Sequence, residues 1–117
     1  MQLAWSSPQL EGCCVSGVRL RAVAGGHVAA AEDLLHVVSQ APRLEFLATF
    51  QSVRIDFNAG NLTLLIEEVE MHARPLSSDG VPCAPLNRAS LPDHALSQAL
   101  LVQDIYVRGR SILRLAS

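Results

Sequence analysis

The stretch that decides the fold is residues 44–75, LEFLATFQSVRIDFNAGNLTLLIEEVEMHARP. At its centre, residues 58–61 read Asn-Ala-Gly-Asn, a composition typical of the short turn that joins two antiparallel strands. On both sides of this turn, apolar and polar residues alternate with the two-residue period of a half-buried strand. The stretch therefore predicts one long β-hairpin with its turn centred on Ala59-Gly60.

The turn also predicts which residues of the hairpin face each other. The pairs next to the turn are Phe57 with Leu62, Ile55 with Leu64, and Val53 with Ile66. Further out the alternation continues one residue out of step, and the pairs become Phe50 with Val69, Ala48 with Met71, and Glu45 with Arg74. The two slips, at Gln51-Ser52 and Glu67-Glu68, face each other. Because a one-residue slip marks a bulge that bends and twists a strand, we expect a sharply bent ribbon.

The bent ribbon keeps one apolar face turned inward along its whole length. That face holds Phe46, Phe50, Val53, Ile55, Phe57, Leu62, Leu64, Ile66, Val69 and Met71. It contains no carboxylate and no histidine, which disfavours acid–base chemistry on the inner side and permits an apolar ligand there.

The rest of the chain divides into shorter predicted elements. We expect an irregular N-terminal arm over residues 1–11, a strand over 13–24, a helix over 27–40, a long proline-rich loop over 75–92, a short helix over 92–101, and strands over 103–107 and 111–115. The helix at 27–40 has an apolar stripe of Ala31, Leu34, Leu35 and Val38 at helical spacing. It should end at Ala41-Pro42, because proline disfavours a helical residue before it.

This order of elements predicts an α+β fold in a single domain spanning residues 1–117. A helix lying in the concave face of a strongly bent antiparallel sheet would bury both apolar faces. That shape is similar to cystatin-like and NTF2-like folds, and the likeness is one of topology. The inhibitory loop of cystatins reads Q-x-V-x-G, whereas Gln51-Ser52-Val53-Arg54-Ile55 has isoleucine in place of the glycine. No inhibitor function is therefore carried over.

The amino-acid composition favours a globular domain and argues against some classes of function. Half of the 117 residues are hydrophobic and 17% are charged, which is typical of a globular domain able to bury its own core. The net charge is −2 and the basic residues are scattered, which argues against nucleic-acid binding. All nine cationic side chains are arginine, which together with the many Ala, Leu and Val residues indicates a GC-rich bacterial genome.

The sequence carries no evident targeting signal. No apolar run is long enough to span a bilayer, and residues 1–12 lack the charged start and apolar centre of a signal peptide. The chain is therefore expected to be cytoplasmic, although a chain from which a leader had been removed would look the same. Cys13, Cys14 and Cys83 have no metal-binding spacing, so we expect free thiols, no metal site and no cofactor.

Two groups of titratable residues lie close together in the sequence and are candidate chemical sites. Glu68, Glu70 and His72 lie two apart on the outward face of the second arm, so the ends of the trio are about 13 Å apart and one ion cannot bind all three. A metal site formed by Glu70, His72 and a cross-strand partner is one alternative. The other is that this row is a solvated acidic face. Ser90, Asp93 and His94 lack the surroundings of a catalytic triad, and Ser90 or Asp93 is interpreted as a helix cap.

Two functional hypotheses follow, and neither assigns a catalytic residue. The first is a non-catalytic interaction or assembly domain that forms a homodimer through its sheet, with Leu47, Leu65 and Tyr106 at the interface because they interrupt the polar outer face. The second is a protein that binds, or is a small enzyme acting on, an apolar small molecule in a cavity between helix and sheet. The lining of that cavity would be Leu34, Val38, Phe46, Phe50, Phe57 and Met71.

Overall fold

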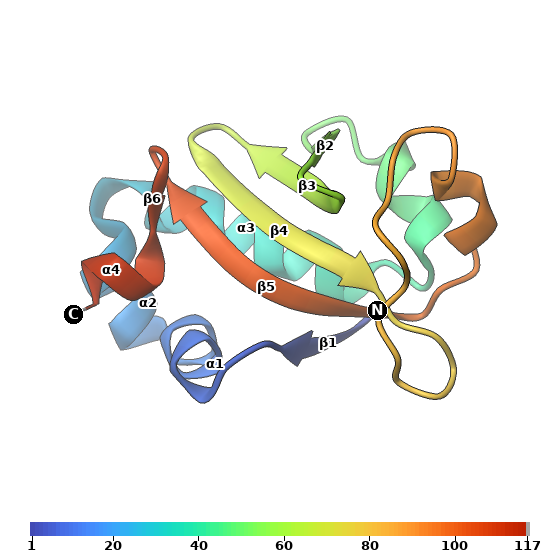
Figure 1. The fold of residues 1–117 in the computed structure, drawn as a ribbon. Coiled ribbons are helices and arrows are strands. Elements are labelled where there is room, and N and C mark those ends of the chain that lie inside the picture. The colour runs from blue at the N-terminus through green and yellow to red at the C-terminus, as the bar shows by residue number, and fades with distance from the viewer. Residues whose placement is uncertain (117) are drawn as a thin grey trace.

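A computed structural model describes residues 1–116 of the chain, which form an α+β fold (Figure 1). The strands are β1 (Gln2–Trp5), β2 (Arg54–Asn58), β3 (Asn61–Ile66), β4 (Val69–Pro75), β5 (Ala99–Val107) and β6 (Arg110–Ser111). The α-helices are α1 (Pro8–Val15), α2 (Gly17–Ala24), α3 (Val28–Gln40) and α4 (Ile112–Leu115). Three 3-10 helices, η1 (Gly25–His27), η2 (Leu44–Thr49) and η3 (Leu91–His94), complete the described elements.

All six strands belong to one open sheet. Its order is β1-β5-β4-β3-β2, and β6 pairs with the end of β5. The strands β2 to β5 pair with one another in antiparallel fashion. The strand β1 runs parallel to β5, with Gln2 opposite Ala99. The sheet is thus mixed, and the prediction of an antiparallel sheet was wrong at β1. The likeness to cystatin-like and NTF2-like topologies stays a prediction.

The inner half of the predicted hairpin is confirmed. Strands β2 and β3 are joined at Ala59 and Gly60, whose φ angles are 52° and 81°. Positive φ at both central residues defines the type I′ turn, which matches the twist of the strands that it joins. The register is the predicted one, with Phe57 opposite Leu62 and Ile55 opposite Leu64.

The outer half of the hairpin prediction was wrong. Residues 67 and 68 do not form a bulge but a second tight turn, in which Glu67 has a φ of 52° and which leads back into β4. Ile66 therefore pairs with Val69. On the other arm, Leu44–Thr49 is the 3-10 helix η2 instead of a strand. The expected charge pair between Glu45 and Arg74 does not form, because Glu45 lies 2.7 Å from Arg43 and Arg74 donates to Asn61 at 2.9 Å.

The segment expected to be a strand, residues 13–24, is helical, and the arm expected to be irregular contains a strand. Residues 1–11 contain β1 and the start of α1, and residues 13–24 lie in α1 and α2. The side chains of Ser7 and Ser16 accept backbone hydrogen bonds at the two helix starts and so act as N-caps. In α2 the buried residues Leu20 and Ala24 are four apart, which is the helical spacing.

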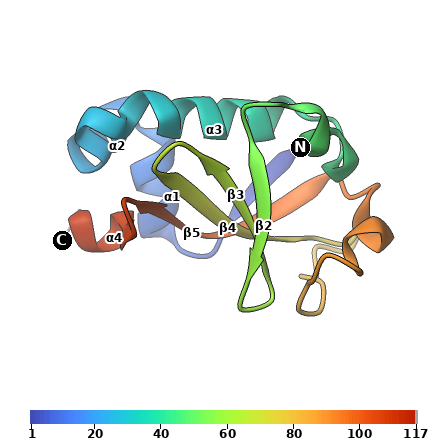
Figure 2. The same ribbon diagram turned by 90° about the horizontal axis from the view of Figure 1, so that it is seen from above.

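The predicted helix over residues 27–40 is confirmed as α3. Its buried residues are Ala30, Ala31, Leu34 and Val38, and it packs against β3 and β4. Figure 2 shows α2 and α3 on one side of the sheet, while no α-helix of the described residues covers the opposite side. We call that opposite side the outer face.

The C-terminal part differs from expectation in two places. The short helix expected over residues 92–101 is limited to η3, and β5 takes up residues 99–107. The strand expected over 111–115 is replaced by α4, whose N-cap is the side chain of Ser111. Between β4 and η3 the chain is a loop with a single strand-like bridge, Leu76 to Pro82. This loop is fixed to the β2–β3 turn, since the Leu86 N–H donates to the Gly60 carbonyl at 2.7 Å.

One hydrophobic core joins the helices to the sheet. Leu34 and Val38 of α3 and Leu62, Leu64 and Met71 of the strands have no exposed surface and belong to the same core cluster. None of the helices in residues 1–116 is long and apolar enough to cross a membrane.

Candidate functional site

The polar side chains of the sheet gather on its outer face. In the register of the strands, Thr63 lies opposite His72 and His72 opposite Asp104, which makes one row across β3, β4 and β5. A neighbouring row consists of Leu65, Glu70 and Tyr106. We call these six residues the outer-face cluster.

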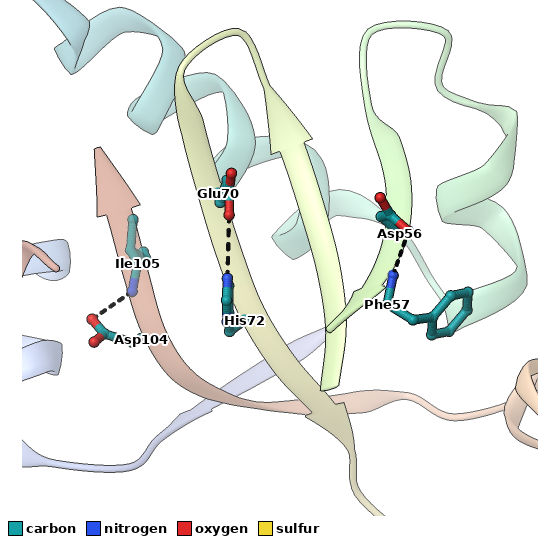
Figure 3. Close-up of polar contacts among 6 residues, drawn as sticks. All are labelled: Asp56, Phe57, Glu70, His72, Asp104 and Ile105. Atoms are coloured by element: carbon teal, nitrogen blue, oxygen red, sulfur yellow. Dashed lines mark hydrogen bonds and ion pairs between the residues drawn. The ribbon is translucent and has the colours of Figure 1, made fainter. Parts of the chain in front are cut away.

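His72 lies at the centre of the outer-face cluster. Its Nε2 is 3.3 Å from Oε2 of Glu70, and its ring lies against the Tyr106 ring with centroids 4.6 Å apart. The side chain is only 14% exposed. Figure 3 shows the Glu70 and His72 side chains pointing toward each other along β4. The row Glu68–Glu70–His72 was expected to be a solvated face, but at His72 that face is largely covered by its neighbours.

Asp104 supports the sheet with both carboxylate oxygens. Oδ1 accepts the backbone N–H of Ile105 at 2.7 Å (Figure 3). Oδ2 accepts the hydroxyl of Ser111 at 2.7 Å. Ile105 lies between the two partners of this edge of β5, since β1 pairs up to Val102 and β6 pairs with Tyr106 and Val107. Asp104 thus satisfies a backbone donor that no strand reaches. It is not a free carboxylate available as a general base.

Thr63 is the unusual member of the outer-face cluster. The residue is only 4% exposed, and its Oγ1 is a buried side-chain atom without a hydrogen-bond partner in the described part of the chain. A buried hydroxyl normally finds a partner, because leaving it unpaired costs free energy. Its neighbours across the strands are Asp56 on β2 and His72 on β4.

The edge strand β2 carries a carboxylate with a defined role. Asp56 Oδ1 accepts the backbone N–H of the next residue, Phe57, at 2.8 Å (Figure 3). Both Arg54 and Asp56 are exposed on the outer face, whereas Ile55 and Phe57 are half-buried on the inner side. The edge thus shows alternating charged and apolar side chains.

The other candidate chemical groups do not form a site. Within residues 1–116, no three His, Cys, Asp or Glu side chains are arranged to hold a metal ion. Ser90 does not cap η3 but exchanges hydrogen bonds with Asn87. The thiols of Cys13 and Cys14 are buried and unpaired, and burial is the main cause that raises the pKa of Cys14 to about 12.

The residues predicted to line a cavity lie in different surroundings. Leu34, Val38 and Met71 are fully buried in the core. Phe46 is 36% exposed on η2, where the Arg43 guanidinium lies 5.2 Å from its ring centroid. Phe50 and Phe57 are half-buried and pack against the edge of the core.

An apolar groove does exist, at a place that the sequence did not indicate. It measures about 170 Å³ and lies between η2, η3 and the β2–β3 hairpin. Its lining is Leu44, Glu45, Ala48, Ile55, Leu62, Leu91, Pro92 and Ala95. None of the six predicted cavity residues is among them. The sequence did not indicate the groove because residues 44–50 were predicted to be a strand. The apolar residues there do not have a spacing that distinguishes a 3-10 helix from a strand.

Of the three predicted interface residues, two lie on the outer face. Leu65 and Tyr106 are half-buried in the same row, on either side of Glu70. Leu47 is fully buried in the core, so its expected place on the outer face was wrong. The reason is that η2 turns this side chain inward.

Comparison with protein-family models, with curated proteins and with solved structures finds no match to this chain.

Proposed function

We propose that this chain is a non-catalytic interaction domain that forms a homodimer through its sheet. The observation that carries the proposal is the open edge of β2, which pairs with β3 on one side only. An open strand edge is a row of backbone donors and acceptors to which another strand can add.

The turn geometry identifies the backbone groups at this edge. In a two-residue hairpin the residues that flank the turn, here Asn58 and Asn61, form a hydrogen-bonded pair. The backbone groups of Arg54 and Asp56 therefore point to β3, and those of Ile55 and Phe57 point outward. Among residues 1–116, no strand takes up the outward groups of Ile55.

The polar groups of the outer face support a non-catalytic role. Both oxygens of Asp104 are used within the sheet, and His72 is held between Glu70 and the Tyr106 ring. A catalytic acid or base must reach a substrate atom directly or through one water. A dimer through the sheet could form in two ways. One is strand pairing at the β2 edge, and the other is contact between two outer faces through the half-buried Leu65 and Tyr106.

The test is sedimentation equilibrium over roughly 1 μM to 1 mM protein, which spans the dissociation constants of weak complexes. We expect a reversible monomer–dimer equilibrium within this range. A strictly monomeric protein at the highest concentration would refute the proposal.

A second candidate function is the binding of a small apolar molecule, and the groove at η2 and η3 favours it. Its volume of about 170 Å³ is comparable to engineered cavities that bind benzene. Titration with benzene should shift the NMR signals of the Ile55 and Leu62 methyl groups. Ala48→Trp, which fills the groove, should abolish the shifts, whereas Ala22→Trp on the exposed side of α2 should not. Unchanged methyl signals in the unmodified protein would eliminate this candidate.

A further inference from the structure

We infer that two copies of this chain pair edge to edge through β2, antiparallel, with Ile55 opposite Ile55 of the second copy. The inference rests on the proposed function and specifies the partner, the register and the contacts. Antiparallel pairing of identical strands is a twofold, closed arrangement, in which each contact is made twice.

Among the registers that are compatible with a twofold axis, this one has the most favourable arrangement of opposed side-chain charges. With Ile55 on the twofold axis, Arg54 lies opposite Asp56 of the second copy, and this opposite-charge pair occurs twice. If the twofold axis moved by one residue, to Asp56, Ile55 would lie opposite Phe57 and the two Asp56 side chains would face each other. Directly opposed unlike charges stabilise a strand pair, and directly opposed like charges destabilise it.

The inner side of the strand agrees with the same register. Ile55 meets its own counterpart, and Phe57 lies opposite Val53 of the second copy. In the single copy Ile55 and Phe57 are half-buried at the sheet edge. Pairing removes their remaining apolar surface from water, which is favourable in proportion to the area buried.

Asp56 is the residue that changes partner on pairing. In the single copy it occupies the outward N–H of Phe57 at 2.8 Å, so the edge is closed at that point. Asp56 lies opposite Thr63, whose buried hydroxyl has no partner. Side chains opposite each other on antiparallel strands have Cβ atoms about 5 Å apart, so Asp56 can turn to accept the Thr63 hydroxyl and the incoming Arg54. Phe57 N–H is then free for the Val53 carbonyl of the second copy.

These contacts explain why the edge suits a second copy of this chain. A strand that presents no cation opposite Asp56 leaves that carboxylate in place over the Phe57 N–H. Charged side chains on an edge are a common protection against indiscriminate strand addition. A copy of β2 supplies Arg54 at the required position, so the edge is complementary to itself.

The decisive experiment is a charge-swap series measured by sedimentation equilibrium, with circular dichroism to verify folding. Arg54→Asp and Asp56→Arg should each weaken the dimer by about 30-fold, because two attractive pairs become two repulsive ones. An equimolar mixture of the two variants should form a heterodimer of restored affinity. The double variant Arg54→Asp/Asp56→Arg should dimerise like the unmodified protein. Arg19→Asp, the same charge change at an exposed site on α2, is the matched control.

The outcomes separate the inference from the proposed function. If the unmodified protein is a monomer throughout, both fail. If it is a dimer and the folded charge variants keep its affinity, the inference fails and the proposed function stands. In that case dissociation by Leu65→Glu would move the interface to the outer face.

Discussion

Replacing Thr63 by valine should stabilise the protein. The substitution keeps the branched shape that fits a β-strand and exchanges the buried, unpaired hydroxyl for a methyl group. An unpaired buried hydroxyl costs about 1–3 kcal/mol in proteins. Since the site is only 4% exposed, most of this cost should be recovered, and we expect the free energy of unfolding to rise by about 1–2 kcal/mol.

Urea denaturation followed by circular dichroism measures this change. With a slope of about 2 kcal/mol per molar urea, the middle of the range for small proteins, the midpoint should rise by about 0.5–1 M at an unchanged slope. All variants should be compared at one low protein concentration, because dimerisation adds to apparent stability. Thr49→Val is the control: that hydroxyl is exposed and donates to the Phe46 carbonyl at 2.7 Å, so its loss should be neutral or slightly destabilising.

The result that would refute the reasoning is a Thr63→Val protein no more stable than its parent. It would mean that the hydroxyl has a partner in solution, such as Asp56 or a water. Thr63→Ser retains the hydroxyl and removes only the methyl group. It therefore measures the contribution of the methyl group to stability separately from that of the hydroxyl.

Three further predictions concern the thiols and one turn. In the native protein Cys83 should react with a thiol reagent before Cys14, which is buried. Burial raises the pKa of Cys14 from 9.0 to about 12, so above pH 9 this thiol ionises in the unfolded state before it ionises in the folded state. The free energy of unfolding should therefore fall between pH 9 and 12. Cys14→Ala should make that decline smaller in thermal melts recorded over this pH range. Gly60→Ala should lower the melting temperature more than Gly80→Ala, because both have positive φ but only at Gly60 would a Cβ lie 2.7 Å from Pro85.

Structure that depends on neighbouring residues was predictable from the sequence. The Ala59-Gly60 turn and the pairing of Phe57 with Leu62 follow from the composition and length of the turn, and the structure confirms them. The helix α3 follows from the periodic spacing of Leu34 and Val38 and from Pro42 after its end. In each case the signal lies within a few residues of the element that it specifies.

Features that depend on distant segments were not predictable. Two polar residues at 67 and 68 shift the apolar alternation by one position, and a bulge and a two-residue turn both produce that shift. The contact between Glu70 and His72 has the two-residue spacing on one face of a strand that the sequence shows, although the sequence favoured a solvated face there. That the neighbours are Tyr106 and Asp104 depends on the β4–β5 register, which itself shifts between His72 and Ala73. Nothing near His72 in the sequence encodes that register.

The parallel strand β1 has a consequence for the order in which the chain folds. Ser6 and Gln103, which hydrogen bond just beyond the β1–β5 ladder, are 97 residues apart. The meander of β2, β3 and β4 needs only two short turns, whereas pairing of β1 must wait until β5 has formed and a long loop has closed. During synthesis on the ribosome, the first strand therefore leaves the exit tunnel long before its partner exists. We expect β1 to dock last and, in native-state hydrogen exchange, to open first.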